Sequence, residues 1–592
     1  MLTTKHVSCD LCIVGGGISG VVAAIAAARE GLKVVLMHER PVLGGNASSE
    51  IRMCISGVGG DSNRETGVLE EIELENMYRN PTKSYAIWDT VLYDMVRREK
   101  NIQMLLNCTC MDADVETGNF AHGRTIRIKS VKGYQMTTQR FIEVEAKLFS
   151  DCSGDSILAP LTGAEFRVGR EAASEFGEIT SAETADLKTM GMSCLIQSAE
   201  THRPVSFIPP TWSAKLTDKH FENRWPNIHS DGQNFWYLEL GGNRDSIGDT
   251  EELRDELIDL AVGTWDYIKN SGKMDAENWD LSFLGFQPGK RESRRMMGEY
   301  LITQCDISDG KVYEDEVAFG GWPLDDHFPD GFYHRGHPNT NYSTPAPYSI
   351  PYRALYSKNV DNLFFAGRNI SVTHMAMSST RVMGTCALLG QAVGSAAAVA
   401  VKNGCTPHDV YCNNMDQLQQ ILLNADAFLP SKVRKVSDVC RNAVLTGGTD
   451  ALRNGQDRAN KVYGTTEDIY CKVKPGTEIG YSFEETEVSS VHIVFSSDLN
   501  RDTLDGRPIE RKRGTVFQRQ LDYPTYHLPT CLCKEFKLVG ELNGEKTEIL
   551  NVTDNHKRFY HINLNQKFDK LTLIPISTWG GDEASVISFD FV

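Results

Sequence analysis

The chain has 592 residues, of which 24% are charged, and its 79 Asp and Glu against 61 Lys and Arg give a net charge of −18. This length is sufficient for two or three domains. The acidic balance argues against a nucleic acid as partner, because phosphate binding needs Lys and Arg gathered on one face.

The 15 cysteines are odd in number and spread along the chain, so they do not form a disulfide framework. Three close pairs, at 9/12, 108/110 and 531/533, have no second pair or histidine at zinc spacing, and we expect no metal site there. Residues 1–7 lack the basic and apolar regions of a signal peptide. Reduced thiols without an export signal predict a cytoplasmic protein.

Residues 10–48 contain the clearest motif. A strand is expected at Asp10–Val14, a small-residue helix at Ile18–Arg29 and a second strand at Lys33–Met37. Gly15, Gly17 and Gly20 form G-x-G-x-x-G between the first strand and the helix, and Glu39 follows 24 positions after Gly15. The glycines allow a tight turn and close approach to a pyrophosphate, which then sits at the positive end of the helix. A carboxylate after the second strand can accept both ribose hydroxyls, so this segment predicts a dinucleotide site.

The next segments mix helices with short alternating strands. We expect a short helix and a glycine-rich loop at 48–60, helices at 69–79 and 88–100, and strands at 101–109, 112–115, 124–131, 141–149 and 148–155. Between 163 and 344 the pattern becomes irregular, with helices expected at 250–270 and 293–305. Residues 345–353 lead back to the core, and a last parallel strand is expected at 359–365.

The apolar run at 382–401 is long enough for a membrane span. It is dominated by Ala and Gly, contains Gln391 and Ser395, and has no aromatic belt. We therefore expect a buried helix there, and no membrane partner.

Beyond residue 434 the chain consists of short alternating runs separated by polar turns, at 489–495, 535–539, 547–552, 568–575 and 584–592. This pattern is typical of an antiparallel β-sandwich. Residues 443–464, with Asp450, Asn454, Gly455 and Arg458, faintly resemble the opening of discoidin-like, galactose-binding-like domains. That resemblance implies a glycan contact.

Several motifs together resemble a bacterial family of FAD-dependent oxidoreductases within the glutathione-reductase-type flavoproteins. They are a second glycine pair at Gly44 and Gly45, YSIPYRAL at 348–355, DNLFFAGRNIS at 361–371, Thr373-His374, STRVM at 379–383 and LGQA at 389–392. The resemblance spans residue 1 to about 425. It implies an α/β fold with a Rossmann-like FAD-binding domain at 1–162 and 345–430 and an inserted α+β substrate domain at 163–344. The β-sandwich expected from the alternating pattern at 434–592 lies outside the resemblance.

The same resemblance implies non-covalent FAD, with Asp155 and Gly367 near the ribityl and pyrophosphate groups. Arg368 stands where many relatives have an Asp, and we expect it to meet a phosphate oxygen instead. The other residues assigned to the cofactor are Gly15, Gly17, Ile18, Ser19, Gly20, Glu39, Arg40, Gly44, Gly45, Asn46, Arg52 and Arg381.

Four residues are candidates for catalysis. The reduced flavin is anionic at N1, and a helix beginning near Arg381 would bring positive potential to that edge. His374 would lie near the ring as a proton donor or acceptor, or else cap a loop. His327 belongs to the polar segments 320–327 and 334–337, which either line a pocket for hydroxyl groups or are ordinary loops, and Arg353 would approach flavin or substrate. Trp322 would stack on a sugar face or anchor the loop. The histidines of these segments match no common metal site.

No second G-x-G-x-x-G follows an apolar strand, so an NAD(P)H domain is not expected. The segment after Gly45 carries the single Cys54 and no redox cysteine pair, so a dithiol relay is not expected either. Electrons would pass through the substrate and an acceptor that the sequence does not identify. We predict hydride transfer between a small polar, carbohydrate-like substrate and flavin N5. One alternative is a fumarate-reductase-like reaction beside a carboxylate, which would use Arg52, Arg353 and Arg381. Another is a non-catalytic flavin- or glycan-binding protein.

Overall fold

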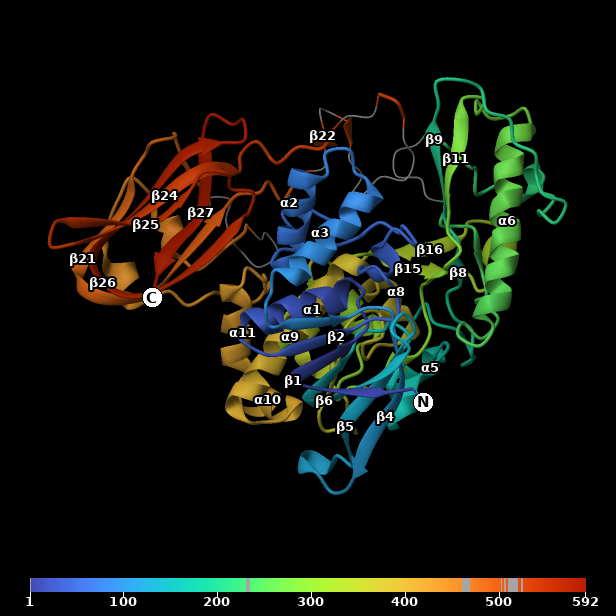
Figure 1. The fold of residues 1–592 in the computed structure, drawn as a ribbon, viewed down its shortest axis with the longest axis horizontal. Coiled ribbons are helices and arrows are strands. Elements are labelled where there is room, and N and C mark those ends of the chain that lie inside the picture. The colour runs from blue at the N-terminus through green and yellow to red at the C-terminus, as the bar shows by residue number, and fades with distance from the viewer. Residues whose placement is uncertain are drawn as a thin grey trace.

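The computed structural model describes residues 2–229, 235–459, 469–501, 503–504, 507–508, 520–522 and 525–592. Its apolar residues form three main buried clusters, in a central α/β part, in the region around α6 and in the C-terminal β part. Figure 1 shows these three parts side by side, with the C-terminal strands on the left and α6 on the right. The residue boundaries between the parts remain predictions from the sequence.

The central sheet has the order β3-β2-β1-β6-β5-β4. β5 pairs with the first half of β6, and β18 pairs with the last residues of β6, 149–151. The strands β1, β2, β3, β6 and β18 run parallel, whereas β4 and β5 extend the sheet as an antiparallel pair. The bounds are β1 Thr4–Val14, β2 Val34–Met37, β3 Ile102–Leu105, β4 Cys108–Thr117, β5 Ile126–Gln135, β6 Arg140–Asp151 and β18 Leu363–Phe365. This Rossmann-like sheet agrees with the predicted fold class.

Four helices position the sheet's glycine turn: α1 (Ile18–Arg29), α2 (Val68–Arg79), α3 (Tyr85–Arg97) and α9 (Met383–Asn403). α9 packs directly on α1, because a Cβ at Gly390 would lie 2.2 Å from the carbonyl oxygen of Ser19 and one at Gly394 would lie 2.4 Å from that of Ala23. Within the described residues α9 alone is long and apolar enough to cross a membrane, yet 94% of that apolar window is buried. The apolar side chains of α9 therefore pack in the protein core.

Three local predictions were wrong in detail. No α-helix forms at 48–60, where the 3-10 turn Gly45–Ala47 is followed by irregular chain with Arg52 in the left-handed region, at φ 64°. The strand expected at 101–109 is split between β3 and β4 by Asn107, at φ 53°. The expected meander strand 141–149 and returning strand 148–155 are one strand, β6, which pairs with β5 and β1 at once.

The helix expected at 293–305 is also absent, and this stretch contains only the two-residue strand β13 and the start of α7. Its polar side chains form hydrogen bonds with residues of several different segments. Ser293 donates to Asp155, whereas the buried Arg295 donates to Glu292 and Glu171. Such tertiary bonds override helical periodicity, since a buried charge without a partner is costly.

The middle of the chain forms several small sheets and the helix α6 (Thr250–Asn270), which the sequence predicted with the same bounds. The other elements here are α4 Leu158–Thr162, β7 Phe166–Arg167, α5 Ala173–Phe176, β8 Met192–Ser193, β9 Ile196–Glu200, β10 Glu239–Leu240, β11 Trp279–Leu284, β12 Gly289–Lys290, β13 Arg295–Met296, α7 Gln304–Ser308, β14 Glu316–Gly320, β15 Leu324–His327, β16 Asn339–Tyr342 and β17 Tyr348–Pro351. The chain then passes through β18 and α8 (His374–Thr380) into α9, followed by α10 Pro407–Asn413, α11 Met415–Asn424 and α12 Asp438–Asn442.

The C-terminal part is an antiparallel sheet of order β20-β27-β21-β26-β24-β25, with β19 on β21. Its strands are β19 Val444–Thr446, β20 Cys471–Val473, β21 Ile479–Phe495, β24 Cys533–Leu542, β25 Glu545–Val552, β26 Phe559–Thr578 and β27 Ala584–Phe591. The register between β21 and β26 shifts twice, and both halves of these long strands bury side chains in one cluster. The two halves of the sheet therefore share one core, as expected of the predicted sandwich. Of the segment compared with discoidin-like domains, residues 460–464 lie outside the described part.

Candidate functional site

A cavity of about 330 Å³ lies at the carboxyl ends of β1 and β2, beside the N-termini of α1 and α9. It extends to the hairpin of β15 and β16. Thirteen of the residues that the sequence assigned to cofactor or catalysis line it. They are Gly15, Gly17, Ile18, Ser19, Glu39, Arg40, Gly44, Gly45, Asn46, His327, Gly367, Arg368 and Arg381. The tertiary structure thus joins segments more than 300 residues apart in one continuous site.

The glycines of the first turn have different roles. A Cβ at Gly15 would lie 2.3 Å from the backbone of Cys152, and one at Gly20 would lie 1.9 Å from the carbonyl oxygen of Gly15. Both positions serve backbone packing, and of the two only Gly15 also lines the cavity. At Gly17 a Cβ would meet nothing within 4 Å, because this position opens into the cavity. The turn leads into the first turn of α1, whose free N–H groups favour an anion.

The end of β2 contributes Glu39, and its neighbour His38 supports the turn. His38 Nδ1 accepts a hydrogen bond of 3.0 Å from the N–H of Gly16, so its Nε2–H donates to the carbonyl oxygen of Val42, at 3.1 Å. The ring thereby holds the glycine turn against β2. The sequence reading missed His38, although it stands directly before the expected ribose-binding carboxylate.

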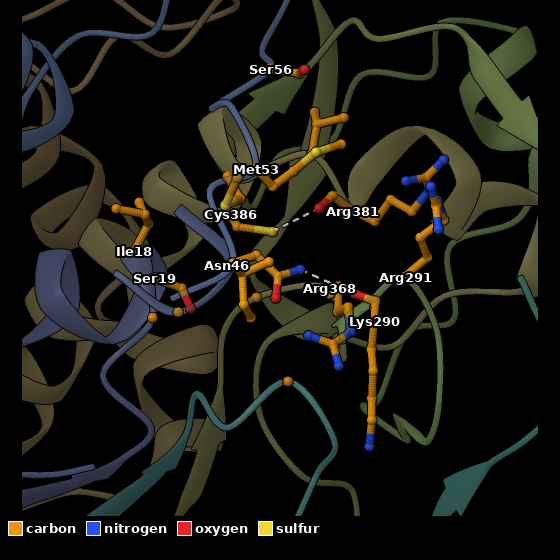
Figure 2. Close-up of a pocket in the computed structure, with 18 of the residues that line it drawn as sticks. Ile18, Ser19, Asn46, Met53, Ser56, Lys290, Arg291, Arg368, Arg381 and Cys386 are labelled. Atoms are coloured by element: carbon orange, nitrogen blue, oxygen red, sulfur yellow. Dashed lines mark hydrogen bonds between the residues drawn. The ribbon is translucent and has the colours of Figure 1, made fainter. Parts of the chain in front are cut away.

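The second glycine pair turns the chain under the cavity. Gly44 has φ 110° and Gly45 has φ 59°, backbone conformations that residues with side chains rarely adopt. The N–H of Gly44 donates to the carbonyl oxygen of Gly16 at 2.8 Å. Asn46 then points its Nδ2 at the carbonyl oxygen of Lys290, at 3.1 Å, as Figure 2 shows. Gly44 and Asn46 therefore connect the first glycine turn to the segment that contains Lys290.

Arg368 lines the cavity after β18, and Asp155 lies behind it rather than in the lining. Asp155 accepts from Arg368 Nη2 at 2.6 Å and from Lys290 Nζ at 2.9 Å. Burial opposes the negative charge of Asp155, but Arg368 and Lys290 hold its pKa below the usual range. Asp155 therefore orients two cations at the cavity, and its expected place near the ribityl and pyrophosphate groups stays a prediction.

Arg381 precedes α9 and donates from Nη2 to the carbonyl oxygen and the carboxylate of Asp325, at 2.9 and 3.1 Å. Its Nε is buried without a hydrogen-bond partner. Arg291 also lines the cavity, and Figure 2 shows its guanidinium group at the same end as that of Arg381. Burial, and then the charge of Arg381, lowers the pKa of Arg291, while Glu239 opposes this shift. Two cations therefore share one end of the cavity.

His327, at the end of β15, lines the same end of the cavity. Its Nδ1 lies 2.6 Å from the buried carboxylate of Glu239, and its Nε2 lies 3.5 Å from Asp325. Because a carboxylate only accepts, Nδ1 carries a proton and Nε2 is the atom left for exchange with a ligand. Trp236, Trp322, Asn339 and Asn341 complete this end.

His374 is the first residue of α8 and does not line the cavity. Its nitrogens lie 2.8 Å from Glu292 and 3.0 Å from Asp326, and all three side chains are largely buried. Burial opposes its positive charge, but the two carboxylates raise the pKa of His374 to about 10. It is therefore an imidazolium at neutral pH, without a lone pair to act as a base. This geometry supports the loop-bracing alternative.

Arg353 and Arg52 lie outside the cavity lining. Arg353 forms a two-point ion pair with the buried Asp315, with Nε at 2.9 Å from Oδ2 and Nη2 at 3.0 Å from Oδ1. Arg52 donates to Gln197 at 2.9 Å and lies over the rings of Tyr85 and Phe283. Both guanidinium groups thus interact with neighbouring side chains of the protein.

The sequence reading also missed part of the substrate side: Met53, Trp236, Lys290, Arg291, Asn339 and Asn341 line the cavity. Lys290 and Arg291 directly precede the stretch that was wrongly read as a helix. Of the three histidines considered for a metal, only His327 lines the cavity, and His334 stacks on Phe328 with ring centroids 3.8 Å apart. The described residues contain no cluster of His, Cys, Asp and Glu suited to a metal ion.

The model of a family described as FAD dependent oxidoreductase matches residues 10–422, which include the glycine turn, the β15 hairpin and α9. The chain belongs to this family. It is an FAD-dependent oxidoreductase, and FAD is its cofactor. No curated protein matches the chain significantly.

Solved structures give weaker likenesses. The OxyS anhydrotetracycline hydroxylase from Streptomyces rimosus is 11% identical, covering 71% of this chain and 67% of its own, with a TM-score of 0.32. A geranylgeranyl bacteriochlorophyll reductase-like protein from Thermoplasma acidophilum is 11% identical, with 71% and 86% covered and a TM-score of 0.30. The family 32 carbohydrate-binding module of Streptococcus pneumoniae EndoD is 12% identical, with 26% and 99% covered and a TM-score of 0.17. These TM-scores are too low to carry the assignment further.

The residues of the cavity fit FAD. The open space at Gly17 admits a diphosphate that any side chain would exclude, and Glu39 stands at the tip of β2 for the ribose. Nε atoms of Arg368 and Arg381 are buried donors without partners, and a bound anionic group would satisfy them. FAD, when bound, supplies hydride chemistry at its ring, and the N-terminus of α9 with Arg381 would favour a negative charge there.

Proposed function

We propose that the protein oxidises a small hydroxylated substrate, such as a carbohydrate, in the end of the cavity beneath the β15 hairpin. The observation that carries this proposal is that His327, which lines the cavity, has its Nδ1 2.6 Å from the carboxylate of the buried Glu239. An alcohol that becomes a carbonyl loses a hydride from carbon and a proton from oxygen. Bound FAD would supply the acceptor for the hydride, and the part left to the protein's own residues is to accept the proton.

His327 is suited to accept it. Glu239 orients the ring and stabilises the positive charge that appears when Nε2 takes up the hydroxyl proton. Asp325 lies 3.5 Å from the same nitrogen and is itself held by Arg381. Burial opposes the ionisation of Asp325, but His327 and Arg381 keep its pKa below the usual range. The Asp325 carboxylate therefore stays charged beside the ring.

The surrounding side chains support a polar, hydroxylated ligand. Asn339 and Asn341 on β16 supply both donors and acceptors, and Trp236 and Trp322 provide flat apolar surface next to them. Such a mixture suits a molecule with several hydroxyl groups on one face and C–H groups on the other. The electron acceptor that completes the cycle, and glycan binding by the C-terminal sandwich, stay predictions from the sequence.

The fumarate-reductase-like alternative is less well supported. It needs free guanidinium groups for a substrate carboxylate, and of the three arginines expected for this role only Arg381 lines the cavity. Arg291 stands beside it, but Arg381 is paired with Asp325, and Arg291 lies 3.5 Å from Glu239 while donating to backbone carbonyls. The carboxylates already present at this end offset the two positive charges.

The test is an anaerobic half-reaction. The oxidised holoenzyme is mixed with a panel of sugars, polyols and sugar acids, and the visible flavin absorbance is followed. We expect at least one hydroxylated compound to bleach the flavin. Reoxidation of the reduced enzyme by enoates, with no bleaching by any hydroxylated compound, would favour the alternative instead.

The same measurement tests the proton acceptor. We expect His327→Asn to retain FAD and to slow flavin reduction about 100-fold, because an amide cannot take up the proton. His334→Asn is the matched control, since His334 stacks on Phe328 and does not line the cavity. Equal reduction rates for wild type and His327→Asn would remove His327 from the mechanism.

A further inference from the structure

Residues 56–67, which we name the wall loop, connect the cavity with the C-terminal sandwich. Ser56 lines the cavity, and its carbonyl oxygen accepts a hydrogen bond of 2.8 Å from the N–H of Gly384 in the first turn of α9. Glu65 is fully buried and accepts from the N–H of Val58 at 2.8 Å. Its carboxylate lies against Gly384, where a Cβ would be only 2.6 Å from Oε1. The wall loop therefore sets the position of the end of α9 that lines the cavity.

The other side of the wall loop is held by the sandwich through Ser62. The carbonyl oxygen of Ser62 accepts from Nη1 of the buried Arg458 at 3.1 Å. Its hydroxyl accepts from Asn500 Nδ2 at 3.3 Å, and its N–H donates to Asn500 Oδ1. All three polar groups of one residue are thus bonded to the C-terminal part.

Ser62 needs this support because its φ is 57°, in the left-handed region that non-glycine residues rarely adopt. Such a conformation persists only where its surroundings hold it. Arg501 of the C-terminal part also contacts the wall loop and the helix that follows it. Arg501 makes a two-point ion pair with Glu70 of α2, at 2.9 and 3.0 Å, and its carbonyl oxygen accepts from Arg64 Nη2 at 2.9 Å.

We propose that Arg458 and Asn500 of the C-terminal part are positioning residues for the flavin site, acting through Ser62 and the wall loop. The sandwich thereby contributes to FAD binding although none of its residues lines the described cavity. This inference rests on the proposed site but not on the identity of its substrate. It assigns the C-terminal part a role in the oxidoreductase itself, distinct from any glycan contact.

The experiment compares three full-length variants with the wild type. Asn500→Ala removes two of the bonds to Ser62. Asn500→Ala combined with Ser62→Gly removes the same bonds but also the backbone strain, because glycine adopts a positive φ without cost. Asn551→Ala is the matched control, since Asn551 is an exposed asparagine on β25 of the same sandwich. Each protein is measured by hydrogen exchange of the 56–67 amides without FAD, and by FAD titration.

We expect Asn500→Ala to speed exchange in the wall loop about 10-fold and to raise the FAD dissociation constant several-fold, whereas Asn551→Ala changes neither. The added Ser62→Gly substitution should recover most of both losses. Unchanged exchange and affinity in Asn500→Ala, or losses that Ser62→Gly does not reduce, would overturn the proposal. If the loop responds as expected but no hydroxylated compound reduces the flavin, the positioning role stands and the proposed substrate class fails.

Discussion

At the scale of single residues, the glycines show how one residue type serves two purposes. Gly17 has an extended backbone, at φ −65° and ψ 177°, and its Cβ position is open. Gly20 has no such space, because its Cβ position lies 1.9 Å from the carbonyl oxygen of Gly15. The first glycine is therefore needed by the ligand and the second by the fold.

This difference gives a paired prediction. We expect Gly17→Val to fold with a free energy of unfolding within about 0.5 kcal/mol of the wild type and to contain no FAD. Gly20→Val should lower the stability by about 3 kcal/mol or more, because the backbone of the turn must move. The measurements are the flavin-to-protein absorbance ratio and denaturant unfolding. A yellow, stoichiometric Gly17→Val protein would show that the diphosphate does not pass this residue.

His374 is a residue whose charge the fold itself creates. Its pKa of about 10 in the folded protein lies above the ordinary value of 6.5, so its stabilising effect is complete below about pH 6.5 and is lost as the pH rises toward 10. We expect the wild-type free energy of unfolding to fall by up to about 1.4 kcal/mol per pH unit across this interval. His374→Gln should flatten that dependence. Unfolding curves at pH 6.5, 8 and 9.5 measure it, and equal slopes in both proteins would contradict the buried imidazolium.

At the scale of elements, the packing of α9 on α1 decides how the flavin end of the cavity is placed. The Ala/Gly composition of α9 resembles that of a membrane span, and its actual partner is a second small-residue helix inside the protein. The two helices approach closely because Gly390 and Gly394 have no side chains to separate them. Their N-termini then open into one cavity.

This close approach reverses the usual effect of an alanine. In an ordinary helix Gly→Ala stabilises by about 1 kcal/mol, because glycine loses more backbone entropy on folding. At Gly394 the added Cβ would lie 2.4 Å from the carbonyl oxygen of Ala23, so we expect Gly394→Ala to destabilise by about 1–3 kcal/mol. Lys402→Ala, an exposed change on the same helix, should stay within about 0.5 kcal/mol. Denaturant unfolding distinguishes the two, and a stabilised Gly394→Ala protein would contradict the packing.

At the scale of the whole molecule, buried ion pairs connect the sandwich to the central part. Arg558 bonds Asp426 at 3.0 and 3.2 Å, and both side chains are almost fully buried. His556 lies 2.8 Å from Glu75 and stacks on Tyr78 with centroids 4.2 Å apart. Figure 1 shows the sandwich joined to the central part on the side of α11. Separation of the two parts would remove these partners and leave charges without compensation.

We therefore expect the two parts to unfold together, as one calorimetric transition. Arg558→Met should lower the free energy of unfolding by about 3 kcal/mol, since it leaves Asp426 buried and unpaired, and should split the transition. Lys567→Met, which removes an exposed pair with Glu485 inside the sandwich, should leave the single transition unchanged. Two transitions in the wild type would mean that the charged interface does not couple the parts.

The sequence by itself determined the features that arise from neighbouring residues. The strand, glycine turn, helix and acidic residue at 10–39 and the helices α1 and α6 follow from local periodicity and from the backbone freedom of glycine. Only the tertiary structure decided the substrate end of the cavity. His327 meets Glu239 across 88 residues, Arg381 meets Asp325 across 56, and Arg291 directly precedes a stretch that local periodicity misread as helix. Such contacts depend on how distant segments pack and on the cost of burying an unpaired charge, which no local pattern records.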